Sequence, residues 1–161
     1  MTSAESAVRS FGTAQGRTIV YFHGCPGAPS ECARFDALAH KSGVRLVGID
    51  RGRIDPALVG QDYFAALAAM VDVIAEGRPV EIIGFSLGGF VAMRTAPLVK
   101  APIMRLNLMS SAAPLECGDF IADMAGGAVF TMAKRSPRLF ALASRVQGWL
   151  AALAPRPWRA A

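Results

Sequence analysis

Four short, continuously apolar segments constrain the fold of this chain more than any other feature of its sequence. They are residues 18–24 (TIVYFHG), 44–50 (VRLVGID), 80–85 (VEIIGF) and 103–111 (IMRLNLMSS). Patterns with helical spacing separate them. Continuous apolar strands that alternate with helices are typical of a parallel sheet that is covered on both faces. The sequence therefore predicts an α/β fold with a mostly parallel sheet of four to five strands, with residues 7–11 as the fifth candidate.

The helical patterns have recognisable ends. Ser30 is a candidate N-cap for the first helix, which the pattern extends to Gly43. The second pattern covers residues 64–75, and the third covers residues 87–99, where Pro97 must end or bend the helix. After residue 111 the alternation stops, and a last helix is expected from Pro137, with Ser136 as its N-cap. We expect two parts, residues 1–118 with the sheet and residues 119–161 with helices.

Composition places the chain among globular proteins. It has 161 residues, of which 53% are hydrophobic, enough for one domain with a core. No apolar run reaches the roughly 18 residues of a membrane-spanning helix, and the N-terminal residues lack a secretory signal pattern. Three cysteines without a CxxC pair make a disulfide framework unexpected and favour the cytoplasm. We expect no metal and no cofactor.

The positive charge is concentrated at one end of the chain. Residues 1–123 are close to neutral, whereas residues 124–161 carry six basic residues and no acidic one. We interpret this segment as a solvated helix face, so that no nucleic-acid partner is expected. An anionic surface, or acidic partners elsewhere in a longer protein, are the alternatives.

The segment GFSLG, in which Ser86 lies between Gly84 and Gly88, is the main candidate for chemistry. It follows the third apolar segment and opens a helical pattern. A chain that reverses from strand to helix within two residues forces the serine into strained dihedral angles and exposes its hydroxyl beside a helix N-terminus. Glycine is needed two residues away on either side, because a side chain would collide there. A serine that only caps the helix is the structural alternative.

A second loop supplies what an acyl-transfer site needs besides a nucleophile. Such a site places two N–H donors where the oxyanion develops. Leu87, the residue after the serine, provides one, and Cys25 in the HGCPG loop provides the other. Gly24 lets the backbone approach, and Pro26 fixes the turn. Cys25 would act through its backbone, with a nucleophilic thiol as the alternative.

Together, TIVYFHGCPGAPSE, VRLVGIDR and VEIIGFSLGGFVAM resemble the N-terminal half of an α/β-hydrolase fold protein over residues 10–112. The resemblance implies Ser86 as nucleophile and the N–H groups of Cys25 and Leu87 as oxyanion donors. It also implies that residues 119–161 are an incomplete helical cap. Relatives often show DRPGxGxS where this chain has DRGRIDPALVG, with Arg51, Arg53 and Asp55, which weakens any inference about the substrate.

The base that the family places after the nucleophile is missing. The two histidines, His23 and His40, both precede Ser86. We expect His23 to brace the oxyanion loop and His40 to be a solvated residue at a helix C-terminus. Glu116 and Asp119 are candidates for the acid, but an acid needs a histidine to orient. The simplest account is a fragment that stops inside the cap.

Three functions remain open from the sequence. The first is a serine hydrolase that acts on a small-molecule ester or amide through an acyl-enzyme and is impaired by the missing histidine and aspartate. The second is an inactive fragment that serves as a binding or interaction module. The third is acyl transfer to an acceptor other than water. An exposed sheet edge also predicts self-association.

Overall fold

The computed structural model describes residues 7–114, 117–121 and 126–153 of the chain. Contacts divide the chain into two compact units, residues 1–112 and residues 113–161. The boundary that the sequence suggests after residue 118 stays a prediction.

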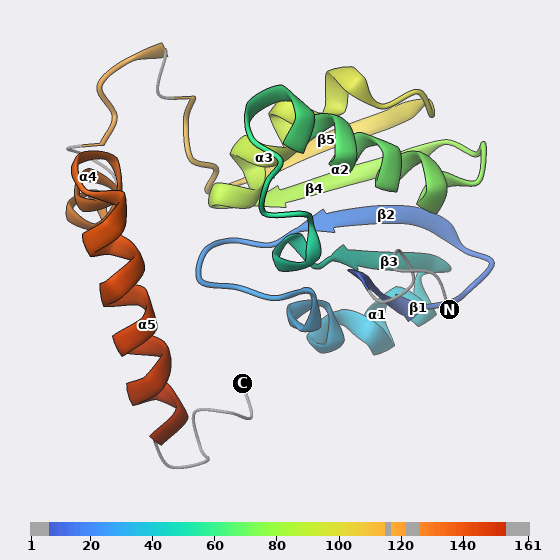
Figure 1. The fold of residues 1–161 in the computed structure, drawn as a ribbon. Helices are drawn as coiled ribbons and strands as arrows, with labels where there is room; N and C mark the ends of the chain where they lie inside the picture. Colours follow the sequence, from blue (N-terminus) through green and yellow to red (C-terminus); the bar gives the residue numbers. More distant parts are fainter. Residues whose placement is uncertain (1–6, 115–116, 122–125, 154–161) are drawn as a thin grey trace. The chain divides into compact units, whose positions relative to one another are not determined.

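The first unit contains a five-stranded sheet whose strand order is β1-β3-β2-β4-β5 (Figure 1). Strands β2, β3, β4 and β5 are parallel, as the apolar segments predict, and β1 pairs antiparallel with β3. The fifth candidate strand is therefore present, at one edge. The strands are β1 (Val8–Gly12), β2 (Arg17–Phe22), β3 (Val44–Ile49), β4 (Val80–Phe85) and β5 (Ile103–Met109).

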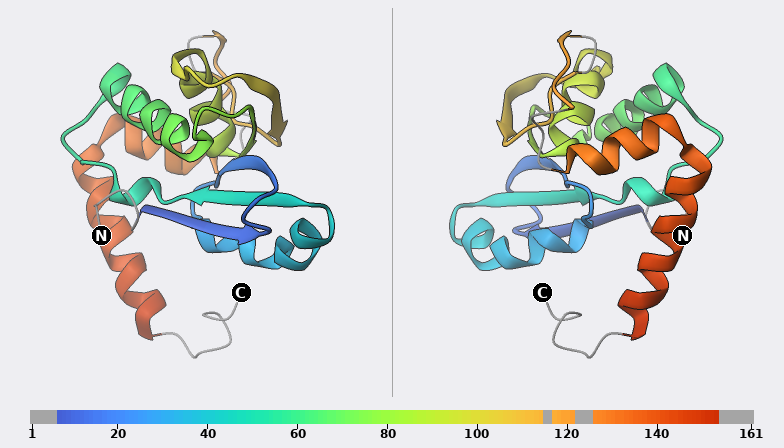
Figure 2. Two further views of the ribbon diagram at one scale, coloured as in Figure 1. Left: turned by 90° about the vertical axis from the view of Figure 1, so that its right-hand side faces the viewer. Right: turned by 90° about the vertical axis from the view of Figure 1, so that its left-hand side faces the viewer.

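Helices cover both faces of this sheet, and each face has its own apolar core. On one face, α2 and α3 pack over a cluster that includes Phe22, Val71 and Ile82. On the other, η2 and α1 pack over Val44 and Leu46. Figure 2 shows α1 and α2 on opposite sides of β3. The helices of this unit are η2 (Pro29–Phe35), α1 (Asp36–Lys41), η3 (Arg51–Arg53), α2 (Gly60–Ala75), α3 (Leu87–Thr95) and η4 (Ala96–Leu98).

The structure confirms one predicted helix boundary and contradicts another. Pro97 ends the third helix as predicted, because α3 stops at Thr95 and a short 3-10 turn follows. The prediction that Ser30 caps the first helix is wrong. That helix begins one residue earlier, at the buried Pro29, whose fixed φ suits the first helical position. Ala28 therefore occupies the N-cap position in place of Ser30, and its carbonyl oxygen accepts the N–H of Glu31 (3.1 Å).

Strand β5 is an edge strand with exposed apolar side chains. In the sheet that the described residues form, β5 pairs with β4 alone. Met104 is 70% exposed, and Leu106, Leu108 and Met109 are exposed as well. Edge strands of stable monomers are usually protected by charges, prolines or covering elements. Arg105 is the single charge that this strand carries.

The described residues of the second unit include the helices α4 (Gly127–Arg135) and α5 (Pro137–Leu153). As predicted, α5 begins at Pro137. Helix α4 starts at Gly127, after Gly126, which adopts a left-handed conformation. Lys134 and Arg145 are exposed, in agreement with a solvated basic face. Within the described parts of the chain, none of the helices has the length and apolar character that crossing a lipid bilayer requires.

Candidate functional site

Ser86 lies at an abrupt turn between β4 and α3. The strand ends at Phe85 and the helix begins at Leu87, so one residue makes the whole reversal. Ser86 has φ 53° and ψ −124°, a region that L-residues rarely adopt. Its backbone is held on both sides, since its N–H donates to Met109 O (3.0 Å) and its carbonyl accepts the N–H of Gly89 (2.9 Å) and Ala112 (3.0 Å). Its side chain makes no helix-cap hydrogen bond.

The glycines around Ser86 permit contacts that no other residue allows. A Cβ atom at Gly84 would lie 2.6 Å from Gly89 Cα, and one at Gly88 would lie 2.1 Å from the carbonyl oxygen of Phe22. Gly89, which the sequence reasoning did not single out, faces Ser111, whose Oγ would lie 2.3 Å from an added Cβ. The turn is therefore packed against the end of β2 and the residues after β5.

The HGCPG loop approaches Ser86 closely. A Cβ atom at Gly24 would lie 3.2 Å from Ser86 Cβ. The N–H groups of Cys25 and Leu87 have no hydrogen-bond partner among the described residues. The structure thus brings the serine and the loop glycine together at the carboxyl ends of neighbouring parallel strands, where α/β sheets bind ligands. The role of the Cys25 and Leu87 N–H groups as oxyanion donors stays a prediction.

No general base contacts the serine within the described residues. The hydroxyl of Ser86 has no hydrogen-bond partner there. His40 is exposed in the last turn of α1, as expected. Asp119 is exposed in the second unit, and Glu116 lies outside the described residues. The sequence-based interpretation that a base is missing therefore stays a prediction.

His23 and Arg51 form a polar cluster behind the loop. His23 is buried, and its Nδ1 lies 2.8 Å from the carbonyl oxygen of Gly24. Because a carbonyl accepts only, Nδ1 must carry the proton in this contact. Arg51 Nη2 donates to His23 O (2.7 Å) and to Gly24 O (3.0 Å). Arg51 lies in the loop where this sequence departs from the pattern of relatives, but no local pattern indicated these contacts.

The environment of His23 predicts an acid sensitivity. Burial lowers the pKa of His23, outweighing its bond to Gly24, and the Arg51 charge adds to this effect against the opposing carboxylates of Glu31 and Asp50. The unfolded chain therefore takes up a proton more readily than the folded one as pH falls through about 6.5. The stability that neutral His23 provides is complete above that pH and decreases below it, until the lower folded pKa is reached.

We expect His23→Gln to flatten this acid loss of stability, measured as the midpoint of thermal unfolding between pH 7.5 and 5. His40→Gln, at an exposed histidine, is the matched control and should leave the acid slope as in the wild type. Equal slopes for all three proteins would show that the pKa of His23 is the same in the folded and unfolded states.

The backbone of Ser86 predicts a second stability effect. Residues held in such a region carry about 1–3 kcal/mol of strain, which glycine avoids. Glycine loses about 0.5–1 kcal/mol through its flexible unfolded state. We therefore expect Ser86→Gly to be about 1 kcal/mol more stable than Ser86→Ala in urea unfolding, because both lack the hydroxyl and only alanine keeps the strain. Equal stability of the two variants would contradict the strained geometry.

The cysteines differ in their surroundings. Cys25 and Cys117 are exposed, while Cys32, a residue of η2, is buried. Burial raises the pKa of the Cys32 thiol to about 12, with a smaller contribution from the Glu31 carboxylate. A thiol that stays protonated is a poor nucleophile, so Cys32 belongs to the core rather than to the site.

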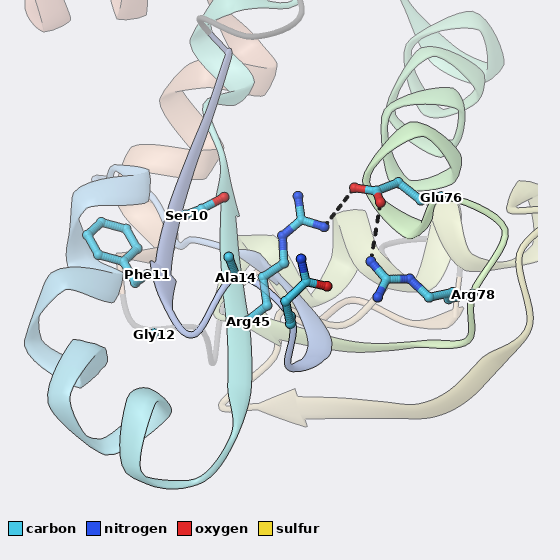
Figure 3. A pocket seen from close by; sticks show the side chains of 8 residues that line it. Ser10, Phe11, Gly12, Ala14, Arg45, Glu76 and Arg78 are labelled. Atoms are coloured by element: carbon cyan, nitrogen blue, oxygen red, sulfur yellow. Dashed lines mark hydrogen bonds and ion pairs between the residues drawn. The ribbon is translucent and has the colours of Figure 1, made fainter.

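A cavity of about 440 Å³ lies at the opposite ends of the parallel strands (Figure 3). Glu76 forms ion pairs there with Arg45 (3.0 Å) and Arg78 (3.2 Å). Both arginines thus share one carboxylate, which Figure 3 shows between them. Arg45 lies at the start of β3 and Arg78 just before β4, whereas Ser86 follows the end of β4. This cavity is separate from the candidate site.

Solved structures share this arrangement of strands and helices. A structure reported with carboxylesterases of the archaeon Nitrososphaera gargenis matches with a TM-score of 0.59 and 19% identity over 80% of this chain and 49% of its own. An alpha/beta hydrolase enzyme from a sediment metagenome of the lagoon of Mar Chica matches with 0.56 and 20% identity, covering 84% and 59%. The mature Bacillus licheniformis lipase matches with 0.54 and 21% identity, covering 80% and 52%.

These similarities show a shared fold. The chain spans about half the length of the solved structures that it matches. No family model matches the sequence, and no curated protein sequence is similar to it.

Proposed function

We propose that Ser86 is the nucleophile of a site for acyl transfer from a small-molecule ester or amide. The similarity of the fold to solved α/β-hydrolase structures supports this proposal. The N–H groups of Cys25 and Leu87 are the proposed oxyanion donors. The observation that carries the proposal is the reversal at Ser86, with the Gly24 loop against it and both N–H groups unoccupied among the described residues. In this proposal the two N–H groups donate to the oxyanion that forms when the hydroxyl attacks.

The proposed chemistry follows from that arrangement. Ser86 Oγ attacks the carbonyl carbon of the substrate and forms a C–O bond, while its proton passes to a base. The carbonyl oxygen becomes an oxyanion between the two N–H groups, and collapse of the intermediate expels an alcohol or an amine that takes up the proton. Water then cleaves the acyl-enzyme and releases the acid. Transfer to an added alcohol or amine in place of water is the variant that product analysis detects.

The rate of this chemistry depends on the base. With no histidine after Ser86 in its sequence, the chain by itself is expected to turn over slowly, with the residual rate that binding and the oxyanion donors provide. A second polypeptide that carries a histidine and an aspartate, added in trans, is expected to raise the rate if it completes the sheet. Two of the similar solved structures are described as a carboxylesterase and a lipase. An ester as the substrate of this chain is therefore a proposal drawn from that similarity.

A fluorophosphonate probe tests the proposal directly. The serine oxygen forms a bond to phosphorus, fluoride leaves, and the proton is taken up by water. We expect slow labelling of one peptide, the one that contains Ser86, and no labelling of Ser86→Ala. Ser110→Ala is the matched control, since Ser110 is a nearby exposed serine that also has positive φ (44°). Labelling that persists in Ser86→Ala, or that is absent from the wild type after prolonged exposure, would contradict the proposal.

A binding or interaction module is the second candidate function, and the edge strand β5 is the observation that favours it. Its backbone groups on the side away from β4 pair with no other strand of the described residues, and with the exposed apolar side chains they can accept another strand. This function needs no reaction at Ser86. A protein that binds through β5 but never reacts with the fluorophosphonate would support it over the first candidate.

The same edge predicts self-association of the isolated chain. We expect concentration-dependent oligomers in sedimentation velocity at micromolar concentrations, and a shift towards monomer when both Met104 and Leu108 are changed to lysine. Lysine on an edge strand opposes pairing because two charges would be brought together. Changing the exposed Val59 and Val73 to lysine adds the same charge elsewhere and should leave association unchanged. A monomeric wild-type chain would contradict this prediction.

A further inference from the structure

Arg51 connects the loop after β3 to the loop that carries Cys25. Its Nη2 donates to two successive carbonyl groups, His23 O at 2.7 Å and Gly24 O at 3.0 Å, both of which lie 27 or 28 residues earlier in the chain. Part of the guanidinium is buried, and its Nε has no partner among the described residues. A charged donor in such surroundings forms a stronger hydrogen bond than an exposed one.

The carbonyl of Gly24 and the N–H of Cys25 belong to one peptide unit. A planar trans peptide directs its C=O and its N–H in opposite directions. A donor that fixes the Gly24 oxygen therefore also fixes the direction of the Cys25 N–H. The positive guanidinium beside that oxygen withdraws electron density across the amide, which makes the Cys25 N–H a stronger donor.

We propose that Arg51 is a positioning residue that aims and polarises the Cys25 N–H, so that the oxyanion formed at residue 86 is stabilised. The inference rests on the proposed oxyanion role of Cys25. His23 assists from the same side, because its Nδ1–H donates to the same Gly24 oxygen. Arg51 touches neither the substrate nor Ser86 in this role, and its effect passes through one peptide bond.

The experiment compares two reactions at one atom. In a Ser86→Cys variant, the thiolate introduced at position 86 attacks p-nitrophenyl acetate through a tetrahedral oxyanion, forms a C–S bond and expels p-nitrophenolate. The same thiolate displaces iodide from iodoacetamide without forming an oxyanion, and the thiol proton goes to water in both cases. Mass spectrometry of peptides separates position 86 from Cys25 and Cys117, which are also exposed. The measured quantity is the ratio of acylation rate to alkylation rate at position 86.

We expect Arg51→Gln in the Ser86→Cys background to lower this ratio about tenfold, less than the 100-fold or greater loss for removing an oxyanion donor altogether. Arg51→Lys should restore part of the ratio, because it keeps the charge and one donor. Arg53→Gln is the matched control on the same turn, where Arg53 pairs with Asp50 instead (3.6 Å), and should leave the ratio unchanged. Near-UV circular dichroism confirms that each variant is folded.

An unchanged ratio in Arg51→Gln would overturn the inference, whether both rates stay the same or fall equally. An equal fall is what a merely structural role would cause, since it alters access to position 86 for both reagents. Failure of the proposed function gives a different result. If native Ser86 does not react with the fluorophosphonate while the ratio in the Ser86→Cys background still depends on Arg51, the positioning role stands and the nucleophilic role of Ser86 falls.

Discussion

Replacement of Gly88 by alanine is expected to remove a large part of the stability of the first unit. An added Cβ atom would lie 2.1 Å from Phe22 O and 2.4 Å from His23 O, and both are backbone atoms at the end of the central strand β2. Flexible side chains can move away from such a collision, but a strand held by β3 and β4 on its two sides cannot. The start of α3 must therefore shift, and with it the turn at Ser86.

We expect a loss of at least about 3 kcal/mol in urea unfolding, at the upper end of the effect of overpacking, or the absence of a cooperative transition. Gly52→Ala is the matched control, because its nearest atom would be the side-chain oxygen Asp50 Oδ1 at 3.3 Å. That variant should stay within about 0.5 kcal/mol of the wild type. A Gly88→Ala protein with wild-type stability would show that α3 does not pack this closely on β2.

Truncation of Phe22 to alanine is the second change with a large expected effect. The Phe22 side chain is fully buried in the core between β2 and the helices α2 and α3. Removing a buried phenylalanine ring leaves a cavity and typically lowers the free energy of unfolding by about 3–5 kcal/mol. Total stabilities of about 5–15 kcal/mol are usual for domains, so this single change removes a large part of it.

Phe35→Ala tests whether burial causes this effect. Phe35 is 52% exposed at the end of η2, so the same atoms are removed from a site that water already reaches. We expect a loss of less than about 1 kcal/mol. Similar losses for the two variants would contradict the assignment of Phe22 to the main core. Both measurements use the midpoint and slope of urea unfolding.

Local signals in the sequence were enough to predict most of the elements. Apolar runs and helical spacing predict β2, β3, β4 and β5 and the helices after them, because these patterns express which side of an element faces the core. Pro97 and Pro137 fix one helix end and one helix start through their own ring geometry. Ser30 misled the prediction, because the helix already begins at Pro29 and Ala28 occupies the N-cap position, which places Ser30 inside the first turn.

The candidate site divides in a similar way. The serine between two glycines can be read from neighbouring residues, because the reversal between β4 and α3 is a local event. The contact of Gly89 with Ser111, the contacts of Arg51 with His23 and Gly24, and the closeness of the Gly24 loop to Ser86 join residues that are more than 20 positions apart. A pattern within one segment cannot show which distant segment that segment will contact in the folded chain.

The sequence by itself determined the kind and order of the elements and the turn that presents Ser86, since steric limits and apolar spacing act over a few residues. Only the tertiary structure decided the strand order β1-β3-β2-β4-β5, the antiparallel β1, and the exposure of Met104 and Leu108 on the β5 edge. Strand pairing and side-chain packing depend on which distant segments meet. That choice is made by the free energy of the whole unit rather than of any one segment.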